Sequence, residues 1–141
     1  MITKSPSQPY RRRPDWPVRL DAFIEQRRRT PFAWGVHDCC QFAREGVRAL
    51  TGVDPAKGWG LRRYTTAKGA ASTLKRLGGV AAIPERAGCM RLPRVALAQR
   101  GDIVEREGVL GICVGAHVAM PGATGLIFTS LLDCTSAWRV A

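Results

Sequence analysis

Apolar residues recur at helical spacing in the first half of the chain and change to a strand-like pattern in the second half. The first helical stretch begins at Asp15, a residue type that caps helices, and should end near Arg29, because Pro31 follows two positions later. Its apolar residues lie three or four positions apart and would share one face, opposite charged side chains. The residues of this apolar face are Trp16, Leu20, Phe23 and Ile24.

Two further helices carry start and stop signals. One should span residues 38–50, since Gly52 can adopt the left-handed conformation that ends many helices. The other should span residues 66–77 and stop at the glycine pair that follows. Residues 53–65, which lie between them and contain one proline and two glycines, are expected to form a long loop.

From residue 80 onward, short apolar runs alternate with glycine-containing turns, which is the pattern of β-strands. A chain that begins with helices and ends with strands is typical of an α+β fold. We therefore predict three N-terminal helices packed on a small antiparallel C-terminal sheet. The expected strands are residues 80–83, 101–104, 109–114, 117–120 and 126–128.

The composition is that of a globular protein. The chain has 141 residues, of which 45% are hydrophobic, and this is enough for one domain with a core. No apolar run approaches the roughly 20 residues of a membrane span, and no secretory signal is recognisable, so we expect a soluble protein made in the cytosol. Residues 1–14 combine prolines with the run Arg11-Arg12-Arg13. We predict that they form a flexible basic arm, ordered against a partner or else simply solvated, ahead of a single domain over residues 15–141.

The net charge is strongly positive, at +11, from 22 lysines and arginines against 11 acidic residues. Such an excess implies an anionic partner. Nucleic acid, the acidic face of another protein and the carboxylates of a cell wall all qualify. The arginine run at residues 27–29 could bind such a partner, although cations at the end of a helix also complement the helix dipole.

Cysteine usage argues against disulfides and metal sites. The five cysteines form an odd set in a chain expected to be made in the cytosol, and none are spaced as a CxxC pair. We predict no metal and no cofactor, and expect most of these residues to be small buried hydrophobes. They are Cys39, Cys40, Cys89, Cys113 and Cys134.

The best candidate for chemistry is the stretch from Pro31 to Cys40. Asp38 should cap the second helix through its side chain, which places Cys39 at the first helical position. A thiol there lies against the positive end of the helix dipole, and this favours the thiolate. His37 precedes the cap, and we expect it to donate a hydrogen bond that supports the turn.

Five motifs follow one another along the chain: the Trp16 helix, Pro31-Phe32-Ala33-Trp34-Gly35 with Asp38-Cys39, Thr51-Gly52-Val53-Asp54, Gly101-Asp102-Ile103-Val104 and Ala137-Trp138-Arg139-Val140. In this order they resemble a family of small phage and prophage tail proteins, which is in turn similar to the NlpC-type cysteine peptidases of papain-like fold that cut peptidoglycan peptides. The resemblance covers nearly the whole chain after the basic arm and implies a papain-like, NlpC-like α+β domain.

The resemblance implies that Cys39 occupies the position of the nucleophile and that the base should open the strand that follows Gly101-Asp102. In this chain that position holds Val109, which cannot exchange a proton. His117 is the candidate substitute, because it would lie on the neighbouring strand and could reach the cleft in a favourable register. His37 lies too close to Cys39 along the chain to face the thiol well.

We therefore expect a structural or assembly protein of the phage tail tip or baseplate, a pseudoenzyme found in the virion after synthesis in the host cytoplasm. Its basic surface and N-terminal arm would contact other tail proteins. One alternative is an active peptidoglycan endopeptidase or amidase that uses Cys39 and His117. A second alternative is a nucleic-acid-binding protein that uses the basic residues.

Overall fold

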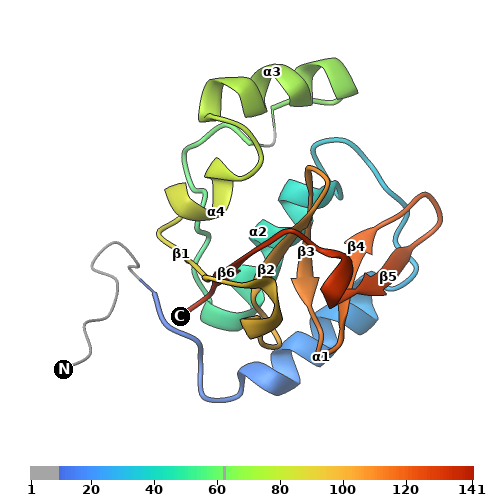
Figure 1. Ribbon diagram of the computed structural model, residues 1–141. Coiled ribbons are helices and arrows are strands. Elements are labelled where there is room, and N and C mark those ends of the chain that lie inside the picture. The colour runs from blue at the N-terminus through green and yellow to red at the C-terminus, as the bar shows by residue number, and fades with distance from the viewer. Residues whose placement is uncertain (1–9, 62) are drawn as a thin grey trace.

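The computed structural model describes residues 10–61 and 63–141. This part of the chain forms four α-helices and one six-stranded antiparallel sheet, so the predicted α+β class is confirmed (Figure 1). The helices are α1 (Trp16–Arg27), α2 (Cys39–Thr51), α3 (Ala67–Leu77) and α4 (Ala82–Arg86), with short 3-10 turns η1 (Val95–Leu97) and η2 (Leu131–Asp133).

The sheet has the strand order β1-β6-β2-β3-β4-β5. Strands β2 to β5 form a meander in which each pairs with the next, and β6 then returns to lie between β2 and β1. The end of the chain is thus hydrogen-bonded into the sheet. The strands are β1 (Met90–Arg91), β2 (Ile103–Arg106), β3 (Val109–Cys113), β4 (His117–Pro121), β5 (Leu126–Ser130) and β6 (Ser136–Arg139).

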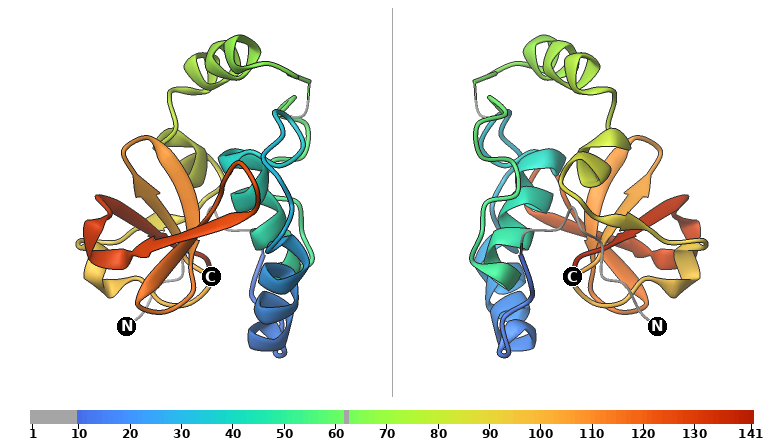
Figure 2. Two further views of the ribbon diagram at one scale, coloured as in Figure 1. Left: turned by 90° about the vertical axis from the view of Figure 1, so that its right-hand side faces the viewer. Right: turned by 90° about the vertical axis from the view of Figure 1, so that its left-hand side faces the viewer.

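Helix α2 lies on one face of the sheet and α1 packs against α2 (Figure 2). The close approach depends on Gly46, because a side chain there would collide with Ile112 of β3. Phe42 and Phe23 stack with ring centroids 5.2 Å apart and join the two helices. Helix α2 begins and ends as predicted, with Asp38 as its N-terminal cap and Gly52 in the left-handed conformation.

The opposite face of the sheet is also covered. Val104, Cys113 and Val118 belong to a second buried cluster, against which Val95 of η1 packs. Strand alternation therefore divides β3 cleanly: Leu110 and Ile112 face α2, whereas Cys113 faces the second cluster. This division decides which β3 side chains can approach the start of α2.

The predicted flexible arm is wrong for residues 10–14. Tyr10 is only 5% exposed, and its hydroxyl donates to the Ala87 carbonyl over 2.8 Å. The Arg12 guanidinium donates to Asp102, which is fully buried and also accepts from Arg139, both at 2.9 Å. A buried carboxylate needs such partners, so this segment is part of the folded domain. The remainder of the predicted arm, residues 1–9, lies outside the described residues.

Two further local predictions are wrong. Residues 80–83 were expected to form a strand, but the chain turns there into the short helix α4; a four-residue apolar run does not distinguish the two structures. The Asp15 side chain does not cap α1, since its carboxylate accepts from Arg19 over 2.8 Å instead. Strand β6 was not expected as a strand, although its last three residues, Ala137 to Arg139, belong to the last quoted motif.

Helix α3 differs from the other long helices in its packing. It stands off the sheet in every view, and Ala70 and Leu77 are its buried residues (Figures 1 and 2). Within the described residues, no helix combines the length and apolar character needed to cross a bilayer.

Candidate functional site

Asp38 is the centre of the candidate site. Its carboxylate is 3% exposed and accepts three hydrogen bonds: from the Gly35 amide at 2.8 Å, from the Gln41 amide at 2.9 Å and from the Tyr64 hydroxyl at 2.8 Å. Gly35 has a φ of 76°, which a glycine adopts without strain, and this lets the turn fold back onto the carboxylate. Asp38 therefore joins the turn, the helix start and the long loop.

Tyr64 and Gln41 complete this buried network. The side-chain amide nitrogen of Gln41, Nε2, donates to the Leu61 carbonyl at 2.5 Å and lies 3.4 Å from the Tyr64 hydroxyl. The pKa of Tyr64 is raised, first by burial, while the hydrogen bond to Asp38 adds to the effect. With its hydrogen bonds committed to these groups, Asp38 has a structural role and is not positioned to orient a base.

Cys39 is the first residue of α2 and is half-buried. Its pKa is lowered, chiefly by a hydrogen bond from the Cys40 side chain; burial opposes this effect, and a hydrogen bond from the Leu110 backbone reinforces it. The pKa of Cys40 is raised, because its thiol donates this hydrogen bond and is buried. The pKa of Cys39 is thus lowered chiefly by its neighbour Cys40, whereas the effect was expected from the helix dipole.

The first residues of β3 provide no base for this thiol. Leu110, whose backbone contacts Cys39, has a fully buried apolar side chain. Val109, the position that the resemblance assigns to the base, is 38% exposed, and strand alternation points its side chain to the face opposite Leu110. Neither side chain can accept the thiol proton.

His117 is the first residue of β4, and the structure does not bring it to Cys39. Its carbonyl accepts from the Val114 amide at 2.9 Å, which places it at the turn between β3 and β4. Val114 lies four residues beyond Leu110, a distance of about 13 Å along a strand. His117 therefore lies at the other end of β3 from the thiol, in an exposed position paired with Ser130.

His37 does not have its expected role as a hydrogen-bond donor. Its side chain is 1% exposed, and neither ring nitrogen has a hydrogen-bond partner among the described residues. The turn is held by the backbones of His37 and Ala33, whose amides and carbonyls bond over 2.7 and 3.2 Å, so the ring is not needed there. Burial lowers the pKa of His37, and the charge of Arg27 lowers it further.

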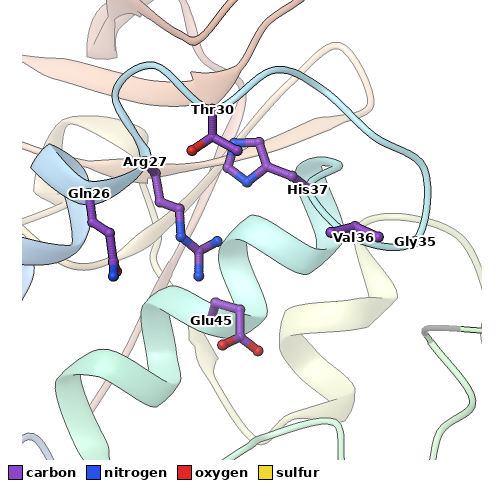
Figure 3. A pocket seen from close by; sticks show the side chains of 7 residues that line it. All are labelled: Gln26, Arg27, Thr30, Gly35, Val36, His37 and Glu45. Carbon is purple, nitrogen blue, oxygen red and sulfur yellow. The ribbon is translucent and has the colours of Figure 1, made fainter.

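A cavity that no pattern in the sequence predicted lies beside His37 (Figure 3). This cavity has a volume of about 410 Å³ and lies between the end of α1, the turn before Asp38 and the middle of α2. Arg27 and Glu45 contribute opposite charges from the two helices. Of its lining residues, only Arg27 belongs to a feature noted in the sequence for possible binding, the arginine run at residues 27–29. The lining residues are Gln26, Arg27, Thr30, Gly35, Val36, His37 and Glu45.

The remaining thiols fit the expectation of buried hydrophobes. Cys40, Cys89, Cys113 and Cys134 are buried and free. Burial raises the pKa of Cys89 to about 11. Within the described ranges, no three residues of the His, Cys, Asp or Glu type are grouped so that they could hold a metal ion.

Comparison with known proteins places the chain in a family without assigning an activity. The model of a family described as a domain of unknown function, DUF6950, matches residues 11–140. The match begins at Arg11, within the segment that packs on the domain. Searches of curated proteins and of solved structures found no match. The chain therefore belongs to the DUF6950 family.

Proposed function

We propose that the protein is a structural or assembly component of a phage or phage-derived tail, at the tail tip or baseplate, built on an NlpC-like, papain-like domain without catalysis. The observation that carries the proposal is the surroundings of Cys39. A helix-start thiol of the kind a cysteine peptidase uses is retained, yet neither imidazole hydrogen-bonds to it.

Cysteine catalysis needs a base within hydrogen-bond reach, about 3 Å, and a third group that orients the base. Here the thiol contacts Cys40 and the Leu110 backbone, and the nearest carboxylate, Asp38, is committed to three donors. A nucleophile without its base fits an inherited fold that now serves assembly.

The charge of the chain supports a role in binding an acidic partner. Each internal ion pair uses one cation and one anion, so pairing within the chain cannot neutralise an excess of 11 positive charges. Several arginines are paired, such as Arg44 with Asp54 over 2.6 Å, but the excess remains for other molecules. Acidic faces of neighbouring tail proteins would provide the missing negative charge.

The composition of the virion and the effect of gene deletion test this proposal. We expect mass spectrometry of purified particles to detect the chain, and electron microscopy of a deletion mutant to show absent or malformed tails. Particles that lack the chain, or a deletion that leaves tails normal in shape and number, would overturn the proposal.

A second candidate is an active peptidoglycan endopeptidase or amidase, and the lowered pKa of Cys39 favours it. In this mechanism the Cys39 thiolate attacks a peptide carbonyl, and the first amides of α2 stabilise the oxyanion. His117, hypothesised as the base, would have to approach from the far end of β3. Release of peptides from peptidoglycan by the wild type, but not by Cys39→Ala, would establish this activity and rule out a purely structural role.

A further inference from the structure

The region between Asp54 and Glu85 carries charge of one sign only. All six of its charged residues are lysines or arginines, although the chain as a whole has one acidic residue for every two basic ones. Residues 55–84 thus form a basic lobe without a carboxylate side chain of its own. Five of the six cations belong to the part of the chain that the structure describes; they are exposed, and none forms an ion pair with another described residue. These five residues are Lys57, Arg63, Lys68, Lys75 and Arg76.

Helix α3 makes this charge accessible. Figures 1 and 2 show it on the outside of the molecule, away from the sheet, and only Ala70 and Leu77 among its residues are buried. Lys68, Ser72 and Lys75 are spaced by four and three positions and share one exposed face. The two lysines are about 10 Å apart along the helix axis, and the small side chain of Ser72 lies between them. A large anionic surface can therefore approach the backbone of α3 closely.

The distribution of exposed apolar side chains favours a nucleic acid over a protein as the partner of the basic lobe. Protein–protein interfaces centre on aromatic and large apolar residues, whereas protein–DNA interfaces are more polar and much more positively charged. Among its described residues, the basic lobe exposes no large hydrophobic side chain. Exposed ones occur elsewhere, for example Ile127 and Phe128 of β5 and Leu132 of η2. The lobe thus has the charge of a nucleic-acid-binding surface and lacks the apolar centre of a protein-binding one.

The aromatic residues and the shape of the basic lobe favour a double helix over a single strand. Proteins that bind single strands stack the bases on accessible aromatic side chains. Of the two aromatic residues in the lobe, Tyr64 is buried and Trp59 is half-buried, with the Arg86 guanidinium over its ring at 5.6 Å from the centre. A protruding α-helix, by contrast, fits the major groove of B-form DNA, which is about 12 Å wide. Lys68 and Lys75 are spaced so that they can contact phosphates on both sides of such a groove.

We propose that the basic lobe binds double-stranded DNA, with α3 in the major groove and with Lys68 and Lys75 on the phosphates. Arg63 adds a further cation beside them. Because the contacts are made to phosphates, binding depends steeply on salt and little on base sequence. Neither Cys39 nor Leu110 belongs to the basic lobe, so the proposal does not depend on the role of the chain in a tail.

Fluorescence anisotropy of a labelled DNA duplex of about 20 base pairs, titrated with the full-length protein, tests the proposal. We expect saturable binding with a Kd in the micromolar range at about 100 mM salt, and at least about a tenfold loss of affinity between about 50 and 200 mM salt. A single strand of the same length should bind more weakly, since the lobe exposes no aromatic side chain for stacking. Poly-L-glutamate, which has negative charge but no groove, should compete less well than unlabelled duplex.

The decisive variant combines Lys68→Gln with Lys75→Gln. Its matched control combines Arg29→Gln with Arg94→Gln, which removes the same charge at two exposed positions outside the basic lobe. The lysine variant should weaken duplex binding at least about tenfold and reduce the slope of log Kd against log salt by about two, whereas the control should change the slope by less than about one. Lys68→Arg combined with Lys75→Arg keeps the charge and should bind as the wild type does.

Three results would overturn the proposal. One is the absence of duplex binding at about 100 μM protein and about 50 mM salt. Another is an equal loss of affinity in the lysine variant and in its control, which would show that the net charge acts without a defined surface. The third is competition by poly-L-glutamate as strong as that by unlabelled duplex, which would indicate an acidic protein as the partner. Because the substituted side chains are exposed, all variants should melt at the temperature of the wild type.

Discussion

Asp38 separates the two side chains that a cysteine peptidase combines, a thiol and an imidazole, and the two point into different parts of the molecule. Cys39 faces the sheet and contacts the Leu110 backbone. The His37 ring packs edge-on against Phe42 of α2, with centroids 5.8 Å apart, and lines the cavity between α1 and α2. The chain thus has a histidine next to its capped cysteine, but the turn that builds the cap directs the ring away from the thiol. Proximity in sequence does not make a catalytic pair.

The largest effect on stability should come from replacing Asp38, which lies between His37 and Cys39 and caps α2. We expect Asp38→Ala to reduce the free energy of unfolding by about 3 kcal/mol, because it removes a helix cap and leaves the buried Tyr64 hydroxyl without its acceptor. Urea denaturation measures this loss, and Asp15→Ala, at an exposed helix start without a side-chain cap, is the control. Equal stabilities of the two variants would contradict the central role of Asp38.

The adjacent cysteines should respond differently to the same substitution. Cys40→Ser places a hydroxyl in the core and should cost about 2 kcal/mol, whereas Cys39→Ser, at a half-buried position, should cost under about 0.5 kcal/mol. Urea denaturation of the two variants measures the difference. A larger loss for Cys39→Ser would show that this thiol is the more important for packing.

Protonation of the His37 imidazole should make the free energy of unfolding depend on pH. The folded-state pKa of His37 is lowered, so between that value and the unfolded value of about 6.5 the unfolded chain binds more protons. Stability is then complete above pH 7.5 or so and falls as the pH drops below about 6.5. Arg27 opposes protonation and Asp38 favours it; Glu45 lines the same cavity.

The contribution of His37 appears as the difference between wild type and His37→Phe. We expect the urea midpoint of the wild type to decline more steeply between pH 7.5 and 5.5, by an amount that corresponds to about 1 kcal/mol or less. Parallel curves for the two proteins would show that the ring is not held neutral by its surroundings.

The smallest expected effect is that of His117→Ala on the Cys39 thiol. Iodoacetamide should modify Cys39 ahead of the four buried cysteines, and the pH dependence of that reaction should not change in His117→Ala, because the two residues lie at opposite ends of β3. Peptide mapping by mass spectrometry follows the reaction. A shift of the Cys39 profile to higher pH in this variant would show that His117 reaches the thiol.

Local signals in the sequence predicted the helix ends well. Thr66 and Gly78 mark the ends of α3 as the cap and the left-handed stop, and their effects depend only on residues a few positions away. The packed segment at residues 10–14 could not be predicted in this way. Arg12 is fixed by Asp102, which lies 90 residues away, and no local pattern identifies that partner.

The candidate site was predicted only in part, because some of its features depend on neighbouring residues and others on residues far apart in the sequence. The Asp38 cap and the position of Cys39 follow from neighbouring residues and are confirmed. The contact with Leu110, the location of His117 and the burial of His37 depend on strand register and on the packing of α1 against α2. The cavity between those helices depends on the same packing, which a single sequence does not specify.

Tail formation in a gene-deleted phage or prophage, restored from a plasmid that encodes either the wild type or Cys39→Ala, tests most directly whether the protein acts in assembly without its thiol. We expect both proteins to restore the same number of normal tails by electron microscopy. Failure of Cys39→Ala to restore tails, although the variant accumulates and melts as the wild type does, would contradict the account and point to a reaction at Cys39.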